Sequence, residues 1–544
     1  MNEKIWSRYH PRITRRRWLL GAFLLFVISF TAIISVPRFA SEATSTTQTN
    51  SWPSFIYDSQ NSRYNSGSGI SSSNVGLLQP AWFFSTGASV ASKPIAYNAS
   101  VTSQPVVANG SVFFSDWLAN TYSINLATGN LNWKDHLNNG SISGTPAVVN
   151  GVDYIAELGP PTVYALNETT GKIIWDNTIT PSPYLGIWSS PVIYDGKLFI
   201  GLSSLGDEVD SSIVGQLVAL NATTGAILWR FNAAIGAGGG AGVWGSVAVD
   251  TNSDAIFFAT GNPYANSSSS LYSNSVISLN ATTGSLIWYN QILQNDMLDR
   301  DFGSTPNLFS LNVNGSSIKA VGEGSKDGYY YIFDRSDGTL ISKVYAGQII
   351  GLAGFLGEGA SLEVFIPGRT EQGAGNTSAN FTCPGCGVLS AYFPTNKSVS
   401  WSLETTDIVG SVALADGVVF FGTQTGNLYG VSTSSGKVLL NSSLPVGIWS
   451  GVTVADGYLI TGTSASSPSI SNGAALGVYA YALNSTTRTT FSSSTGFASS
   501  SSAELSNSPT ILVVWALTAT AVALMLGVTL GFLVRRPSSN EKKK

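Results

Sequence analysis

The sequence has little charge, little histidine and little cysteine, and each shortage excludes a class of protein. Charged residues make up 11% of the 544 residues, against about 25% in an ordinary soluble domain. The net charge of −4 at pH 7 argues against a basic nucleic-acid-binding protein. Only His10 and His136 are histidines, so a histidine-based zinc centre cannot form. Only Cys383 and Cys386 are cysteines, too few for a disulfide framework.

The two cysteines lie in one Cys-Pro-Gly-Cys segment. Gly387 follows it, where a c-type haem attachment site needs histidine, so we expect no haem c. A local disulfide between Cys383 and Cys386 is expected if this part of the chain lies outside the cell.

Both ends of the chain carry a long uncharged run beside basic residues. Residues 18–36 follow the basic segment 1–17 and are expected to be either a cleaved signal peptide or an uncleaved anchor. Residues 509–534 form an uncharged run of 26 residues, which predicts a transmembrane helix before the basic tail 535–544. Basic flanks stay in the cytoplasm, so the middle of the chain is expected on the outer side of the cell membrane.

The middle of the chain is acidic and rich in glycosylation sequons. Residues 18–534 hold 16 basic and 29 acidic residues, a net charge of −13. Residues 484–508 are rich in Ser and Thr and predict a flexible stalk. The density of Asn-x-Ser/Thr sequons is typical of a glycosylated surface protein. There are 13, at Asn98, Asn109, Asn139, Asn167, Asn221, Asn266, Asn280, Asn314, Asn376, Asn380, Asn396, Asn441 and Asn484.

One phrase recurs eight times along the middle of the chain. Alternating residues predict a strand, Asn or Asp caps a turn, Gly supplies the corner, and a second strand ends in Trp. Four strands per copy and no helical stretch predict an eight-bladed β-propeller over residues 45–492. We expect the Trp to pack between blades. The copies are residues 123–133, 165–175, 219–229, 278–288, 332–342, 391–401, 430–440 and 480–491.

The phrase A-x-(D/N)-x-x-T-G-x-x-x-W resembles the tryptophan-docking motif of quinoprotein alcohol dehydrogenases, propellers that use pyrroloquinoline quinone (PQQ). Residues 52–82 are similar to the first segment of these enzymes, and the resemblance covers roughly residues 52–492. It implies an all-β, eight-bladed propeller of the quinoprotein alcohol dehydrogenase type, here with flanking transmembrane helices.

The resemblance also implies site residues. In the segment 244–263, Trp244 matches the tryptophan that stacks on the quinone, and Asn262 matches a metal ligand. In the segment 298–309 (LDRDFGSTPNLF), Asp299 matches a residue that is both the catalytic base and a metal ligand. Asp301 matches an extra metal ligand found in family members suited to lanthanides. Two carboxylates this close repel each other, which a metal ion would relieve.

Three further assignments follow from the same resemblance. Lys326 matches the cation that contacts the quinone carbonyls, where it would stabilise developing negative charge. Glu208 is assigned as the metal-binding acid, with Asp207 as the alternative. Ser203 is assigned to the cofactor.

The sequence also departs from the family pattern. It has no adjacent cysteine pair to stack on the quinone, and Trp188 lies where the family often has a Thr that holds the cofactor. We cannot place the Arg that pairs with the cofactor carboxylates.

The expected function is that of a membrane-anchored, extracytoplasmic dehydrogenase. It would oxidise an alcohol or a sugar with PQQ and Ca²⁺ or a lanthanide ion, and pass the electrons to an acceptor that the sequence does not identify. The alternative is a propeller without cofactor that serves as a cell-surface interaction or assembly scaffold. A glycan-binding surface protein is the third alternative. No nucleic-acid partner is expected.

Overall fold

The computed structural model divides the chain into two units, Met1–Thr49 and Asn50–Lys544. It describes residues 50–89, 100–138, 140–205, 213–235, 239–264, 270–294, 296, 298–349, 351–369, 386–464 and 474–483. The first unit, the apolar runs 18–36 and 509–534 and the segment 484–508 therefore lie outside the described residues. Within the described ranges, no helix has the length and apolar character needed to cross a membrane.

The described strands form eight sheets, and all their pairings are antiparallel. The first four are β2 (Val106–Ala108), β3 (Ser111–Ser115), β4 (Asn120–Asn125), β5 (Leu131–His136); β6 (Ala147–Val149), β7 (Val152–Glu157), β8 (Thr162–Asn167), β9 (Ile173–Thr178); β10 (Leu185–Gly186), β11 (Val192–Tyr194), β12 (Lys197–Ser204), β13 (Gln216–Asn221), β14 (Ile227–Asn232); and β15 (Ala248–Asp250), β16 (Ala255–Ala259), β17 (Ser275–Asn280), β18 (Leu286–Gln291).

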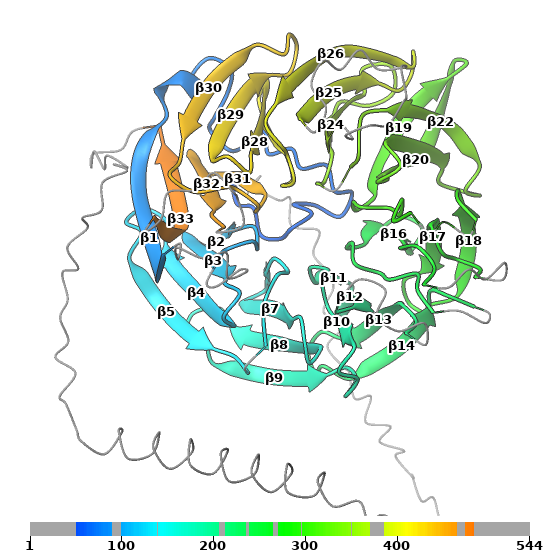
Figure 1. Ribbon diagram of the computed structural model, residues 1–544, viewed down its shortest axis with the longest axis horizontal. Coiled ribbons are helices and arrows are strands. Elements are labelled where there is room, and N and C mark those ends of the chain that lie inside the picture. Colours follow the sequence, from blue (N-terminus) through cyan, green and yellow to red (C-terminus); the bar gives the residue numbers. More distant parts are fainter. Residues whose placement is uncertain are drawn as a thin grey trace, which may run out of the picture. The chain divides into compact units, whose positions relative to one another are not determined.

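The other four sheets complete a ring (Figure 1). They are β19 (Asn307–Val313), β20 (Ser316–Gly324), β21 (Tyr329–Asp334), β22 (Leu340–Tyr345); β23 (Gly354–Leu356), β24 (Glu363–Arg369), β25 (Gly387–Phe393), β26 (Ser398–Thr405); β27 (Ala413–Ala415), β28 (Val418–Gly422), β29 (Asn427–Ser432), β30 (Val438–Ser443); and β31 (Val452–Ala455), β32 (Tyr458–Gly462), β33 (Ala475–Ala482) with β1 (Gln79–Ser89). The expectation of an all-β, eight-bladed propeller is confirmed.

The eighth blade closes the ring because it combines both ends of the domain. Its outermost strand, β1, comes from the beginning of the domain and pairs with β33 from its end. The register runs from Gln79 opposite Ala482 to Ser89 opposite Ala475. Long-range pairing thus replaces the hairpin that joins the outer strands of the other blades.

The repeated Trp packs between neighbouring blades, as the sequence predicts. Trp133 on β5 donates its indole N–H to the carbonyl of Glu168 at 2.8 Å, and its ring covers Gly171 in the next blade. A Cβ on Gly171 would lie 2.6 Å from Trp133 Cε3, and its φ is +71°, so only glycine fits there. The same Trp–Gly pairing occurs five more times, at Trp82–Gly129, Trp175–Gly225, Trp229–Gly284, Trp288–Gly338 and Trp401–Gly436.

The turn Asn of the repeat caps its own turn. Asn167 Oδ1 accepts hydrogen bonds from the Thr169 and Thr170 amides at 3.1 and 3.0 Å. Asn280 does the same for Thr282 and Thr283 at 3.1 and 2.8 Å. Asn therefore takes the place of the turn Asp without loss of the side-chain cap.

Residues 50–78 precede β1 and run across the centre of the ring (Figure 1). Their backbone pairs with the innermost strands of several blades, for example at Trp52–Val107 and Tyr64–Leu414. Arg63 is fully buried there and donates hydrogen bonds to the carbonyls of Val412 and Phe55. Its Nη2 also donates to Gln104 Oε1 at 2.7 Å. The segment thereby joins distant blades at the axis.

Candidate active site

The polar residues expected to act together lie at one end of two neighbouring blades. Trp244 precedes the inner strand β15, and Asn262 follows the second strand β16. In the next blade Asp299 and Asp301 precede β19, and Lys326 follows β20. Antiparallel strands bring the start of an inner strand and the end of the second strand to the same face of the ring. The fold therefore collects all these residues on one face.

Lys326 is the centre of the cluster. Its Nζ lies 2.7 Å from Asp299 Oδ1 and 2.8 Å from Asp301 Oδ1. The same ammonium lies over the ring of Trp244, 4.8 Å from its centroid, within the range of a cation–π interaction. Trp244 in turn donates its indole N–H to Asp301 Oδ2 at 3.0 Å. One cation thus joins two carboxylates and an aromatic face.

The two carboxylates differ in environment. Asp301 is 5% exposed, whereas the side chain of Asp299 is 63% exposed. Burial raises the pKa of Asp301 to about 6, although the Lys326 charge opposes that rise. Burial alone would lower the pKa of Lys326, but the charges and hydrogen bonds of Asp301 and Asp299 raise it overall. The ammonium form is therefore held between the two acids.

Backbone contacts fix the two loops that carry this cluster. The Lys326 amide donates to the Asp301 carbonyl at 2.8 Å. The Ser325 hydroxyl donates to the Arg300 carbonyl at 3.0 Å. Asp299 itself has φ of +54°, a left-handed conformation that Asp adopts more readily than most residues. The bend at Asp299 therefore lies in a tightly tied loop.

Asn262 lies in a loop that packs directly beside Asp301. It is 4% exposed, and its carbonyl accepts the Ala241 amide at 2.8 Å. A Cβ on the preceding residue, Gly261, would lie 2.9 Å from Asp301 Oδ2. Glycine at 261 thus allows the Asn262 loop to approach the buried carboxylate.

Ser203 and Tyr264 continue the polar surface into the neighbouring blade. Ser203 lies on β12 and is 7% exposed. Tyr264 hydrogen-bonds with Ser203 and Ser204. Burial raises the pKa of Tyr264, and the Asp301 charge raises it further, which places this phenol within electrostatic reach of the acid cluster.

Comparisons with known proteins bear on this arrangement. The family described as glucose/ethanol/alcohol dehydrogenase, beta-propeller domain, matches residues 52–143 and 178–349. The quinohemoprotein alcohol dehydrogenase ADH IIB of Pseudomonas putida is 28% identical over 219 residues, which cover 34% of this chain and 31% of that protein. The chain spans about a third of the length of the first curated relatives it matches.

Solved structures show the same fold. The quinohemoprotein alcohol dehydrogenase from Comamonas testosteroni superposes with a TM-score of 0.67 at 20% identity, over 81% of each chain. A europium-containing methanol dehydrogenase gives a TM-score of 0.64 at 17% identity, over 79% of this chain and 98% of that one. The chain is a quinoprotein alcohol dehydrogenase-like β-propeller.

Within this propeller the structure brings four of the expected residues into direct contact: Trp244, Asp299, Asp301 and Lys326. Their roles in catalysis remain predictions. Glu208 and its alternative Asp207 lie outside the described residues. Among the residues that are described, no group of three acidic, histidine or cysteine side chains is arranged to hold a metal ion.

The sequence reasoning missed Tyr264. It lies two residues after Asn262 in a Gly-Asn-Pro-Tyr segment, and its hydroxyl joins Ser203 to the surroundings of Asp301. An aromatic residue directly after a predicted metal-binding loop was the available clue.

Two features of the sequence that could carry chemistry have structural explanations. Cys386 is disulfide-bonded, and Cys383 lies outside the described residues. Trp188 donates its indole N–H to the Ser204 carbonyl at 2.9 Å, and its ring lies 6.1 Å from that of Trp117. Trp188 therefore packs in the position where the family often has a Thr.

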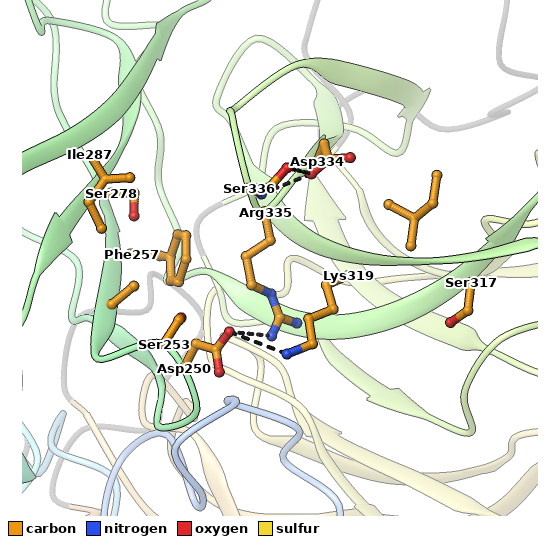
Figure 2. A pocket seen from close by; sticks show the side chains of 12 residues that line it. Asp250, Ser253, Phe257, Ser278, Ile287, Ser317, Lys319, Asp334, Arg335 and Ser336 are labelled. Carbon is orange, nitrogen blue, oxygen red and sulfur yellow. Dashed lines mark hydrogen bonds and ion pairs between the residues drawn. The ribbon is translucent and has the colours of Figure 1, made fainter.

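A cavity of about 470 Å³ lies between the two site-bearing blades, at the other end of their strands (Figure 2). Asp250 ends β15, and its Oδ2 accepts from Arg335 Nη1 at 3.3 Å, with Lys319 Nζ at 3.9 Å. Arg335 also donates to the carbonyls of Phe309 and Ala320. These contacts hold the two blades together. Arg335 therefore has a structural role, on the face of the ring opposite Asp299, Asp301 and Lys326.

Proposed function

We propose that the propeller is a membrane-anchored, extracytoplasmic quinoprotein dehydrogenase that oxidises a small alcohol with PQQ and Ca²⁺ or a lanthanide ion. The observation that carries the proposal is Lys326, held between Asp299 and Asp301 and above the ring of Trp244. An ordinary surface lysine would be solvated, whereas this one is 15% exposed. A flat aromatic face, a fixed cation and an exposed carboxylate are the groups that such an oxidation requires.

The donor set fits a hard metal ion. Asp299, Asp301 and Asn262 offer carboxylate and amide oxygens, which Ca²⁺ prefers. The two carboxylates are neutralised by Lys326 in the structure, and a metal ion would supply that positive charge instead. The europium content of the similar methanol dehydrogenase supports a lanthanide as one of the two choices.

The residues around Trp244 fit a flat cofactor. The hydrogen bond from Trp244 to Asp301 fixes the plane of the indole, so its face is held ready for a planar ring. PQQ, when bound, accepts the two electrons that leave the alcohol. Lys326 lies at the face of the indole and would stabilise negative charge on the ring oxygens.

Asp299 is the proposed base. It is the exposed member of the acid pair, so an alcohol can reach its carboxylate and give up the hydroxyl proton there. Asp301 is buried and is held by Trp244 and Lys326, which suits a metal ligand rather than a base. Tyr264 is held nearby by its hydrogen bonds with Ser203 and Ser204, within electrostatic reach of Asp301.

The proposed location rests on the sequence. The basic tails 1–17 and 535–544 flank apolar runs, and the residues between carry a net charge of −13 with 13 sequons. A propeller on the outer side of the membrane, anchored by residues 509–534, is consistent with this pattern.

The experiment is cofactor loading of the purified full-length chain. PQQ is added with Ca²⁺ or with La³⁺, and the absorption spectrum of protein-bound quinone is recorded together with ethanol-dependent dye reduction. We expect binding and turnover with at least one of the two ions. A chain that binds no PQQ with either ion is a scaffold rather than an enzyme.

A further inference from the structure

A second cavity lies on the flank of the two loops that carry Asp299, Asp301 and Lys326. These three residues and Trp244 are called the acid–lysine cluster below. Its volume is about 500 Å³. Its lining includes Arg300, Asp327, Tyr329, Tyr331, Leu340 and Lys343. Arg300 lies between Asp299 and Asp301, and Asp327 directly follows Lys326, so the cavity and the cluster share both loops.

The loop backbone separates the cavity from the cluster. Asp301 is buried toward Trp244, whereas its neighbour Arg300 is exposed and lines the cavity. The Ser325 hydroxyl bonds to the Arg300 carbonyl at 3.0 Å, so the loops are tied at this point. A molecule in the cavity would therefore lie beside the cluster without reaching the Asp299 carboxylate.

The wall of the cavity is aromatic. The rings of Tyr329 and Tyr331 lie 6.0 Å apart, and the ammonium of Lys343 lies 4.1 Å from the first ring centroid and 5.4 Å from the second. Tyr331 donates its hydroxyl to Asp327 at 2.5 Å, and the Tyr329 amide donates to the same carboxylate at 3.0 Å. The first bond fixes the ring of Tyr331 and the second fixes the backbone at Tyr329. Aromatic rings in such a wall suit a flat ligand.

The lining of the cavity holds two cations, Arg300 and Lys343, and one acid, Asp327. A second acid, Asp296, lies beside the loop and accepts the Arg300 amide at 2.8 Å. Arg300 and Lys343 are exposed, and neither forms an ion pair with a described residue. Asp327 is the acid that lines the cavity, and Tyr331 and the Tyr329 amide already occupy it. Two exposed cations against one lining acid, beside an aromatic wall, favour an anionic ring compound.

We propose that this cavity binds a planar, anionic redox ring that acts as the electron acceptor of the propeller. The acceptor role rests on the proposed function. An alcohol loses two electrons and two protons when it becomes an aldehyde, and the acceptor gains two electrons and two protons. The cavity lies in a suitable place, because electrons from a quinone bound at the cluster would have to cross only the loop backbone that the cavity and the cluster share.

The probe is dichlorophenolindophenol, an anionic, planar dye that accepts two electrons and two protons. Its dissociation constant is measured on the full-length chain without PQQ, by quenching of protein fluorescence. The variant is Arg300→Gln with Lys343→Gln. The matched control is Lys172→Gln with Lys437→Gln, which removes two exposed lysines from other blades.

We expect the cavity variant to weaken binding of the dye about tenfold and the control to leave it unchanged, since each exposed charge contact contributes modestly. Binding of the cationic dye phenazine methosulfate should not weaken in the cavity variant. Tyr329→Leu, which removes the ring and keeps both charges, should also weaken the anionic dye.

Equal dissociation constants for the cavity variant and the control overturn the proposal, as does a wild-type chain that does not bind the anionic dye. The PQQ-loaded chain then tests the role. If ethanol reduces neither dye, the proposed function fails and the acceptor role with it, whereas the binding site stands. If ethanol reduces both dyes and the cavity variant has an unchanged KM for the anionic dye, only the acceptor role fails.

Discussion

Lys326 is the residue on which the proposed chemistry of the site depends, because it neutralises the two carboxylates that are proposed to bind a metal ion. Its Nζ contacts Asp299 and Asp301 at 2.7 and 2.8 Å. A metal ion and this ammonium compete for the same negative charge. If the proposed metal ion binds at this site, the side chain of Lys326 has to give up at least one carboxylate.

Lys326→Met should raise the affinity of the chain for Tb³⁺ about tenfold or more, because a competing unit charge is removed at contact distance. The measurement is Tb³⁺ luminescence excited through tryptophan, since Trp244 is hydrogen-bonded to Asp301. Lys319→Met is the matched control, because Lys319 lies 3.9 Å from Asp250 on the opposite face. An affinity that rises equally in both variants, or in neither, contradicts the competition.

Asp299→Asn should lower alcohol turnover of the PQQ-loaded chain about 100- to 10,000-fold, the usual contribution of a general base. The amide keeps the size of the side chain but cannot take the proton. Binding of PQQ should change much less, because Trp244 and Asp301 remain. The measurement is kcat with ethanol beside a PQQ titration. Turnover within a few-fold of wild type would show that another group is the base.

At the scale of the element, the Trp–Gly contact is the unit that joins blade to blade. Trp133 donates to the Glu168 carbonyl, and its ring fills the space above Gly171. The contact requires glycine for two reasons: the backbone is left-handed at this position, and the Trp ring leaves no room for a Cβ. The Trp–Gly contact occurs at six of the eight blade junctions. In the other two blades, Ser342 and Leu440 occupy the position of the Trp.

Gly171→Ala should lower the free energy of unfolding by about 2–5 kcal/mol, from about 1–2 kcal/mol for a left-handed alanine and about 1–3 kcal/mol for the clash with Trp133. Gly151→Ala is the control, because Gly151 has φ of +81° and no neighbouring heavy atom within 4 Å of an added Cβ. Urea unfolding followed by tryptophan fluorescence measures both. Equal losses would mean that the Trp contact adds nothing beyond the backbone conformation.

The repeat made the blades predictable, because each copy encodes its own strands, turn and docking Trp within about a dozen residues. The acid–lysine cluster was predictable only through the flanking motifs of Trp244, Asp299 and Lys326. The roles of Tyr264 and Arg63 could not be predicted from the sequence. Each occurs once, outside the repeat, and each acts through partners from distant parts of the chain, as Arg63 does with Val412.

At the scale of the whole molecule, the propeller buries several acids that have no full set of partners. Asp153 is fully buried, and neither of its carboxylate oxygens has a hydrogen-bond partner. Burial raises the pKa of Asp153 and of the fully buried Glu323 well above their usual values. Glu363 on β24 is 6% exposed, and burial raises its pKa from 4.5 to about 7. Each of these acids favours the protonated form in the folded state.

The pH dependence of stability follows from the upward direction of these pKa shifts. A carboxyl group whose pKa is higher in the folded state than in the unfolded state binds more protons when the chain is folded. Its contribution to the free energy of unfolding is therefore complete at a pH below the unfolded pKa, and it is lost as the pH rises through the folded pKa. For Glu363 the window lies between pH 4.5 and about 7. The full rise corresponds to about 3 kcal/mol, of which about 2–3 kcal/mol falls between pH 5 and 7.5.

The chain should therefore be more stable toward urea near pH 5 than near pH 7.5, unlike proteins whose carboxylates are paired in the folded state. Glu363→Gln should flatten this profile by about 2–3 kcal/mol across the same interval, because the amide does not titrate. Asp337→Asn is the control, since hydrogen bonds to Thr339 lower the pKa of that exposed acid and its effect lies at lower pH. A profile that rises from pH 5 to 7.5, and that Glu363→Gln leaves unchanged, would show that the buried acids are ionised and compensated in the folded propeller.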